Sequence, residues 1–375
     1  KKMPRESVVE IKTVNRNRIY RMIYQNPRIS RPELCHRLGL SMPTVMQNVR
    51  YLQDRGLVEE GGSLDSTGGR KAVALTCVKD ARTAVGLDLT ANHISGVLVD
   101  LEGGILAESR EKRAFAVSGE YADALAGMVR DLIGKAAAPA ERVLGVGVSM
   151  PGTFSADGGL MLDSRVLRMQ NLRCAELSRS IPLPCVFCND ANAAGFAEVW
   201  DVQSPSDALY LSLSNTVGGA ILLGGQLYKG ENQRGGEFGH IPVERDGKRC
   251  YCGKKGCLDA YCSATVLSDL AGGSLPAFFR ELREGAPKAR IAWADYLDNL
   301  AAGVDILRMA FDCPVILGGY VGAYMEDQLE ELRGRLAYLN RFDRDGGYVR
   351  VCRYRTEASA VGAALIHVQA FVNSI

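Results

Sequence analysis

The sequence contains no uninterrupted run of about 18 apolar residues, the length that a membrane-spanning helix needs. Its first ten residues, Lys1 to Glu10, are charged where a secretory signal would carry an apolar centre. Apolar residues are not depleted either, since they make up 47% of the 375 residues, and this excludes a disordered chain. We therefore expect a cytoplasmic protein with no membrane partner and with two or three compact units.

A disulfide framework is also absent from the pattern. The 11 cysteines are odd in number and scattered, which is typical of free thiols or of a metal site. Cys250, Cys252 and Cys257 do cluster, and His240 precedes them as one of only four histidines. Three thiolates and one imidazole satisfy a tetrahedral zinc ion, and a closed set of four protein ligands is the structural kind of site. We predict one structural Zn²⁺ per chain, with three reduced thiols in a polar loop as the alternative.

The charges are unevenly distributed along the chain. Residues 1–80 hold 15 Lys and Arg against 8 Asp and Glu, a net charge of +7, so the overall charge of +2 leaves −5 for the remaining residues. A basic head on an acidic body suggests that the head binds a polyanion.

Three helices are predicted within this basic head. The first runs from Asn15 to the Asn26-Pro27 pair, the second begins at the N-cap Ser30, and the third begins at the N-cap Ser41 and ends at Gly56. The tight connection between the second and third helices predicts a helix-turn-helix that binds double-stranded DNA. The third helix carries the polar residues that we expect to contact phosphates and base edges: Ser41, Thr44, Gln47, Asn48, Arg50 and Tyr51.

A wing is predicted after the third helix. Strands at Leu57-Val58 and at 73–75 flank a loop whose tip holds two glycines followed by Arg70 and Lys71. An arginine on such an arm suits the narrow minor groove of A·T-rich DNA. The alternatives are a solvated basic hairpin and a winged helix that binds protein.

The body reads as two similar α/β units. From Thr83 glycine-punctuated strands alternate with helices, and a second unit of the same style begins near Ala208. We expect a winged helix-turn-helix domain at 1–80, a first lobe at 81–207 and a second lobe at 208–375, with a ligand cleft between the lobes.

The motifs of the body resemble a known family. Gly236-Glu237-Phe-Gly-His240 followed by Cys-x-Cys-Gly-x-x-Gly-Cys-Leu is similar to the signature of the ROK family, which groups sugar-responsive repressors with sugar kinases. The resemblance extends to Pro151-Gly152, Asn189-Asp190, Gly318-Gly319 and the winged head. It implies a two-lobed actin-like (ribonuclease H-like) sugar-kinase fold and a homodimer or tetramer.

The resemblance also implies a sugar site. Asn189 and Asp190 would bond sugar hydroxyls, Glu237 and His240 would contact the anomeric end, and Asp259 stands where the family usually has glutamate. Gly152 belongs to the same set. The alternative for Asn189-Asp190 is a helix N-cap. The ligand would be a sugar or a sugar phosphate.

The phosphate loops of the family's kinases are altered here. Asp-x-Gly-Gly-Thr is replaced by Asp88-Leu-Thr90-Ala91-Asn92, and Gly-Thr-Gly by Ser214-Asn215-Thr216. Residues with a Cβ restrict the close approach of phosphate that glycines permit. We therefore predict a sugar-responsive DNA-binding regulator, most simply a repressor of carbohydrate genes, that is not an enzyme. A sugar kinase with an added DNA-binding domain and a ligand-independent DNA-binding protein are the alternatives.

Overall fold

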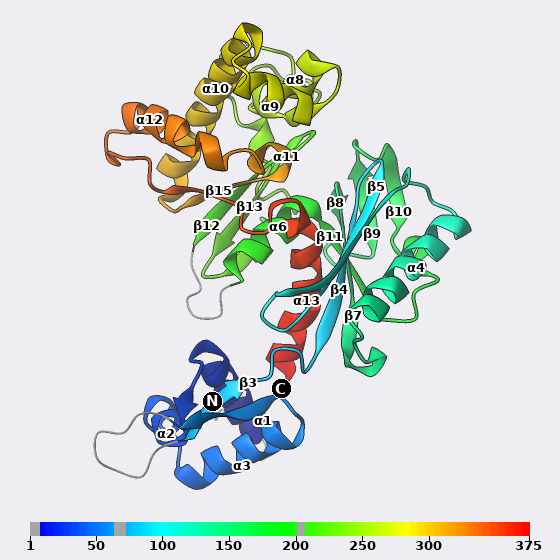
Figure 1. The fold of residues 1–375 in the computed structure, drawn as a ribbon, viewed down its shortest axis with the longest axis vertical. Coiled ribbons are helices and arrows are strands. Elements are labelled where there is room, and N and C mark those ends of the chain that lie inside the picture. The colour runs from blue at the N-terminus through cyan, green and yellow to red at the C-terminus, as the bar shows by residue number, and fades with distance from the viewer. Residues whose placement is uncertain (1–7, 64–72, 201–206) are drawn as a thin grey trace, which may run out of the picture.

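The computed structural model describes residues 8–63, 73–200 and 207–375, which form a small head and a two-lobed body (Figure 1). Within these residues no helix is both long enough and apolar enough to span a bilayer.

The head is a winged helix-turn-helix. Ser30 and Ser41 cap the second and third helices as expected, since each hydroxyl accepts a hydrogen bond from the backbone N–H three residues later. Gly39, with φ of 65°, ends the second helix. The elements of the head are α1 (Val8–Gln25), β1 (Ile29–Ser30), α2 (Arg31–Leu38), α3 (Met42–Asp54), β2 (Val58–Ser63) and β3 (Val73–Cys77), with sheet order β1-β3-β2.

The first lobe is built on a five-stranded mixed sheet with the order β11-β7-β4-β5-β6. β4 pairs parallel with β7 and antiparallel with β5, and helix α4 covers one face of the sheet (Figure 1). Its elements are β4 (Thr83–Leu89), β5 (His93–Val99), β6 (Ile105–Lys112), α4 (Gly119–Lys135), β7 (Val143–Met150), β8 (Thr153–Phe154), β9 (Leu160–Ser164), β10 (Met169–Arg173), α5 (Ala175–Ser178), β11 (Cys185–Asn189) and α6 (Asp190–Val199).

The second lobe repeats this arrangement with the order β14-β13-β12-β15-β16, in which β12 takes the place of β4. The two similar halves expected from the sequence are thus present. Its elements are β12 (Ala208–Leu213), β13 (Val217–Leu223), β14 (Gln226–Tyr228), α7 (Asp259–Cys262), α8 (Ala264–Ser268), α9 (Leu275–Arg283), α10 (Pro287–Phe311), β15 (Val315–Gly318), α11 (Gly319–Gly322), α12 (Leu329–Leu339) and β16 (Val349–Val351).

The last helix, α13 (Ala358–Ser374), returns to the first lobe, although the sequence analysis assigned 208–375 to the second. It packs on β4, β7 and α6 because glycines clear its path: a Cβ at Gly147 would lie 1.9 Å from the carbonyl oxygen of Ala363. Its far end reaches the head, where it packs against α1 (Figure 1). Head and first lobe therefore share one hydrophobic core, in which Ile19 and Ile23 of α1 are grouped with Val368 of α13.

Candidate functional site

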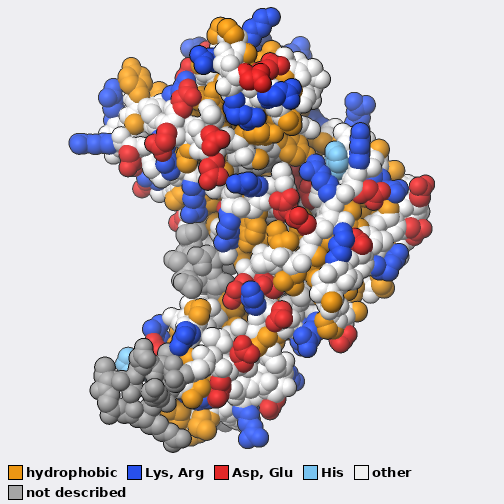
Figure 2. Space-filling model, in the orientation of Figure 1, with side chains coloured by type: hydrophobic (Ala, Val, Ile, Leu, Met, Phe, Trp, Pro, Cys, Tyr) orange, Lys and Arg blue, Asp and Glu red, His pale blue; other side chains and the backbone are white. Residues whose placement is uncertain are grey.

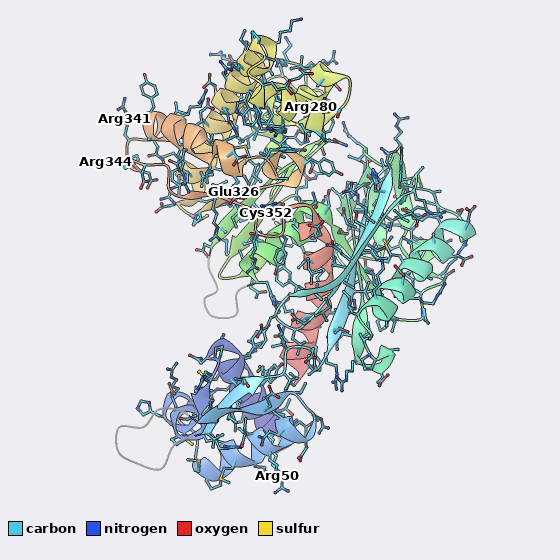
Figure 3. All side chains as sticks on the ribbon, in the orientation of Figure 1. Arg50, Arg280, Glu326, Arg341, Arg344 and Cys352 are labelled. Atoms are coloured by element: carbon cyan, nitrogen blue, oxygen red, sulfur yellow. The ribbon has the colours of Figure 1, made fainter. Side chains whose placement is uncertain are left out.

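Helix α3 carries the predicted DNA-contacting surface of the head. Val45, Val49 and Leu52 are buried against the rest of the head, while Gln47 and Arg50 are exposed. Arg50 projects away from the body at the outer side of the head (Figure 3). The polar face therefore points outward, as a recognition helix requires.

Two residues of that predicted surface lie elsewhere. Asn48 is only 6% exposed, and its Nδ2 donates to the carbonyl oxygen of Thr44 at 2.8 Å, so the expectation that it is exposed is wrong. It lies on the buried side because it follows Val45 by three residues and therefore shares the inward face of the helix. Tyr51 is half-buried between the guanidinium groups of Arg16 and Arg55, whose carbons lie 3.5 and 3.8 Å from the ring centroid.

The remaining members of the predicted DNA surface are distributed as follows. Ser41 is exposed, and its hydroxyl caps α3 at the same time. Thr44 is half-buried. Arg70 and Lys71 lie outside the described residues. Sequence reasoning missed Met42 and Met46, which are 39% and 55% exposed on α3 and add apolar contact area to its outer face. Their positions four residues apart on the exposed face were the available signal.

The predicted metal ligands come together in the second lobe. One ligand atom from each of His240, Cys250, Cys252 and Cys257 lies within 4.8 Å of all the others. The Sγ atoms of Cys252 and Cys257 are 3.7 Å apart, and Nδ1 of His240 is 3.7 Å from Sγ of Cys250. Zn–S bonds of about 2.3 Å in a tetrahedron place two sulfurs about 3.8 Å apart, so this donor set fits a zinc ion.

The loop that carries the thiols is held tightly by its backbone. Gly256 has φ of 76°, and a Cβ there would lie 1.7 Å from the carbonyl oxygen of Glu244. Only glycine therefore lets the chain turn at this point.

The other nitrogen of His240 faces away from the thiols. Nε2 lies 3.3 Å from the hydroxyl oxygen of Tyr251. Arg165 of the first lobe donates from Nη1 to the carbonyl oxygen of Tyr251 at 2.8 Å and lies over its ring. The metal-ligand loop thus contacts both lobes.

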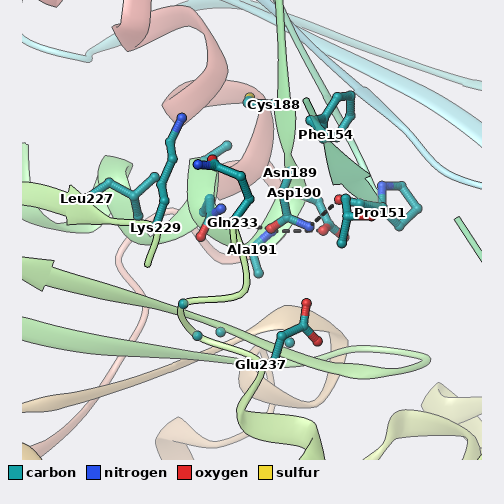
Figure 4. A pocket seen from close by; sticks show the side chains of 18 of the residues that line it. Pro151, Phe154, Cys188, Asn189, Asp190, Ala191, Leu227, Lys229, Gln233 and Glu237 are labelled. Atoms are coloured by element: carbon teal, nitrogen blue, oxygen red, sulfur yellow. Dashed lines mark hydrogen bonds between the residues drawn. The ribbon is translucent and has the colours of Figure 1, made fainter. Parts of the chain in front are cut away.

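A cavity of about 840 Å³ lies between the two lobes. Five of the six residues predicted to bind sugar line it, namely Gly152, Asn189, Asp190, Glu237 and His240. Figure 4 shows Glu237 of the second lobe across the cavity from Asn189 and Asp190 of the first. The sequence-based assignment therefore selected residues from both lobes that meet at one place.

Asn189 and Asp190 also begin helix α6. Oδ1 of Asn189 accepts from the N–H of Asn192 at 3.0 Å, and its Nδ2 donates to the carbonyl oxygen of Gly152 at 3.1 Å. Oδ1 of Asp190 accepts from the N–H of Ala191 at 2.9 Å. The helix-cap alternative is therefore correct as a local description, and it is compatible with a ligand site because both residues still line the cavity.

The carboxyl group of Asp190 is electrostatically perturbed. Burial raises its pKa above the usual value, the backbone hydrogen bond from Ala191 opposes this effect, and the nearby Glu237 adds to it. A carboxyl group in this state can accept a hydrogen bond when ionised and donate one when protonated, which suits a hydroxyl-rich ligand.

Asp259 does not line the cavity, contrary to the expectation from the resemblance. It is 6% exposed, and its Oδ1 accepts from the N–H of Val217 at 2.6 Å. The shorter side chain therefore holds the start of β13 in place of a ligand.

The altered phosphate loops make hydrogen bonds with other parts of the protein backbone. The hydroxyl of Thr90 accepts from the N–H of His93 at 3.0 Å, and the N–H of Thr90 donates to the carbonyl oxygen of His93, which closes the turn after β4. In the second loop the carbonyl oxygen of Ser214 accepts from the N–H of Ala264 at 2.7 Å.

Several cavity residues had no sequence signal. Lys229 and Gln233 enter from the segment after β14 (Figure 4), and Ile366 and Gln369 enter from α13. They belong to no motif, and only the folded chain brings α13 next to the cavity.

Comparisons with known proteins agree with this architecture. Residues 84–370 match the model of the ROK family, and residues 14–59 match a winged helix-turn-helix DNA-binding model. The chain is 29% identical over 263 residues to the xylose repressor of Bacillus subtilis, which covers 68% of this chain and 67% of that protein. It is 27% identical over 260 residues to the N-acetylglucosamine repressor of Escherichia coli O6:H1, which covers 68% of this chain and 64% of that protein.

Two solved structures are similar to this chain in fold. A ROK family transcriptional regulator, a homologue of the E. coli MLC protein, covers 97% of both chains with a TM-score of 0.76 at 22% identity. A ROK family glucokinase from Streptomyces griseus, in complex with glucose and AMPPNP, covers 76% of this chain and 99% of its own with a TM-score of 0.62 at 26% identity. The two-lobed body is common to both, and the match to the regulator also includes the head.

Proposed function

Because the chain belongs to the ROK family, we propose that it is a sugar-responsive transcription regulator that binds DNA through α3 and binds its effector between the lobes. One observation carries this proposal. A cavity that presents an amide and a carboxylate, Asn189 and Asp190, is lined by α6 and α13, and both helices share one hydrophobic core with an outward-facing recognition helix. The ROK family transcriptional regulator named above covers 97% of this chain, so its likeness spans both parts.

The DNA-binding role rests on the exposed face of α3. Gln47 offers an amide for base edges and Arg50 a guanidinium for phosphate or guanine. Both signs of charge are interspersed over the face of the molecule in Figure 2, so the net charge of the head does not form a single basic surface on that face. We assign the specific contacts to α3 and to the loop that holds Arg70 and Lys71. Recognition helices of this kind usually read two half-sites, which favours a homodimer or tetramer. We propose that this assembly acts in the cytoplasm.

We assign a structural Zn²⁺ to His240, Cys250, Cys252 and Cys257. Four protein ligands leave no open coordination position for catalysis. Coordination through Nδ1 would fix the ring of His240 so that Nε2 points toward Tyr251 and the cavity. The metal would thereby order a loop that touches the effector.

We further propose that the effector is bound and not phosphorylated. Phosphoryl transfer depends on positioning and neutralising the phosphates, and both loops that do this in related kinases lack their glycines here; in the first loop, the N–H of Thr90 also donates to the carbonyl oxygen of His93. The retained Asp190 and the likeness to a glucokinase favour a sugar kinase as the second candidate.

A single experiment separates the two candidates. The purified chain is mixed with xylose, glucose or N-acetylglucosamine, and both the unfolding temperature and the release of ADP from MgATP are measured. We expect a sugar to raise the unfolding temperature without ADP release, and Asp190→Ala to abolish the rise. Sugar-dependent ADP release would identify a kinase, and no thermal response to any sugar would contradict sugar sensing.

A further inference from the structure

A second cavity, of about 320 Å³, lies at the end of the sugar cavity that faces the head. It is bounded by α1, α6, α13 and the turn between β13 and β14. The two cavities adjoin, since Phe196, Gln226 and Gln369 line both of them.

The segments around α6 and α13 each line both cavities, and along each of them the later residues line the cavity nearer the head. On α6, Asp190 and Ala193 line the sugar cavity, and Trp200, the residue that follows the helix, lines the second. On α13, Ile366 lines the sugar cavity and Asn373 lines the second. At a rise of 1.5 Å per residue, Asp190 and Trp200 are separated by about 15 Å along the helix, which is far more than one sugar ring occupies. We call the two adjoining cavities along α6 and α13 the channel.

The channel offers the chemistry of a site for neutral hydroxyl-rich molecules. Its shared wall combines an aromatic ring, Phe196, with the amides of Gln226 and Gln369, and the second cavity adds the indole of Trp200 and the amide of Gln25. Amides both donate to and accept from hydroxyls, and aromatic faces pack against the apolar side of a ring. Charged groups are few there, since Arg21 is the one charged residue among those that line the second cavity; its guanidinium keeps its positive charge, donates to the neutral amide of Asn373 and is exposed to solvent.

We propose that the channel is a second sugar subsite, so that the effector is a neutral oligosaccharide and not a single monosaccharide. Its first unit would bind at Asn189 and Asp190, and its further units would follow α6 toward the head. This proposal rests on the proposed sugar-sensing function and specifies its ligand class.

The far end of the channel explains why chain length would matter for regulation. Gln25 and Tyr24 of α1 belong to the DNA-binding head and line the second cavity. About two turns earlier on α1, Nδ2 of Asn17 donates to the carbonyl oxygen of Val372, a residue that also lines the second cavity, so α1 is bonded to α13. A sugar chain that reaches α1 contacts the head directly, whereas a monosaccharide at Asp190 does not.

Calorimetric titration of the full chain tests the proposal. Three series are used: xylose, xylobiose and xylotriose; N-acetylglucosamine and its β-1,4-linked dimer and trimer; glucose, cellobiose and cellotriose. In the series whose monosaccharide binds, we expect the dimer or trimer to bind at least tenfold more tightly. Gln25→Trp fills the second cavity from α1 and should remove this gain while leaving monosaccharide affinity unchanged. Ala370→Trp places the same ring on the exposed side of α13 and should have no effect.

The outcomes separate this proposal from the function it rests on. Equal affinities for monomer, dimer and trimer, or a gain that survives Gln25→Trp, would overturn the channel while sugar sensing stands. A phenyl glycoside that gains as much as the dimer would overturn the choice of an oligosaccharide in favour of an apolar group. Failure of every sugar to bind would contradict sugar sensing itself.

Discussion

Replacing Asp88 by asparagine should stabilise the protein at neutral and alkaline pH. Asp88 lies near the end of β4, and Ser149 donates a hydrogen bond to its Oδ1 at 2.7 Å. Burial raises its pKa from 3.8 to about 7, and the hydrogen bond from Ser149 only partly opposes this effect. The ionised carboxylate therefore costs folding free energy that an isosteric amide does not.

The magnitude follows from the difference between the folded and unfolded pKa values. Three pH units at 1.36 kcal/mol each give about 4 kcal/mol as an upper bound. The side chain retains partial contact with water, so we expect a gain of about 2 kcal/mol for Asp88→Asn at pH 8. Because the folded pKa is raised, the folded state holds a proton between about pH 4 and pH 7 that the unfolded state has lost. The cost of Asp88 thus grows as pH rises through this window and is complete above it.

Urea unfolding of both proteins at pH 8 and at pH 4.5 measures this effect. The advantage of Asp88→Asn should be largest at pH 8 and should shrink by at least half at pH 4.5. Ser149→Ala serves as the control, because it removes the donor and should destabilise the protein at pH 8. An asparagine variant that is no more stable at pH 8, or whose advantage does not change with pH, would refute the reasoning.

Three further predictions concern the metal, the core and the recognition helix. Cys257→Ser should lower the zinc content, measured by elemental analysis, from one ion per chain to near zero and should reduce sugar binding. Cys185→Ser, outside the cluster, should retain the metal. Full zinc retention in Cys257→Ser would disprove the assigned ligand set. Gly147→Ala should lower the free energy of unfolding in urea by on the order of 3 kcal/mol, because its Cβ would lie 1.9 Å from the carbonyl oxygen of Ala363. Gly134→Ala, with open space around its Cβ in α4, should leave this free energy unchanged or raise it. Equal effects of the two substitutions would contradict the packing described for α13. Arg50→Ala should weaken DNA binding in fluorescence anisotropy and, if Arg50 contacts phosphate, lower the salt dependence of binding by about one ion. Arg280→Ala on α9 of the second lobe (Figure 3) should leave DNA binding unchanged. Unchanged affinity for Arg50→Ala would exclude α3 from the DNA interface.

Local patterns were sufficient to predict the head and the metal cluster. The caps at Ser30 and Ser41 act within one helical turn, and the thiols of Cys250, Cys252 and Cys257 are close in sequence, so short-range geometry alone determines them. Local reasoning also identified Asn189 as a helix cap, whereas its place in the cavity was implied by the resemblance to the ROK family.

Long-range packing decided what the sequence analysis missed. Asn48 is polar, yet the packing of α3 against α1 and α2 buries it, and its amide donates to the carbonyl oxygen of Thr44 within the helix. Asp259 has the charge of the family's glutamate but one methylene fewer, and a backbone N–H takes its carboxylate. The place of α13 depends on glycines of β4 and β7 more than 200 residues earlier, which no local pattern connects to it.

The central claim is that sugar binding between the lobes and DNA binding by α3 are linked through α13 and α1. A duplex selected by the protein from random sequence serves as the DNA, and its dissociation constant is measured by anisotropy with and without a saturating sugar. The account predicts that sugar changes this constant severalfold, and that DNA changes the dissociation constant of the sugar by the same factor. Identical DNA affinities with and without a sugar that is demonstrably bound would contradict it.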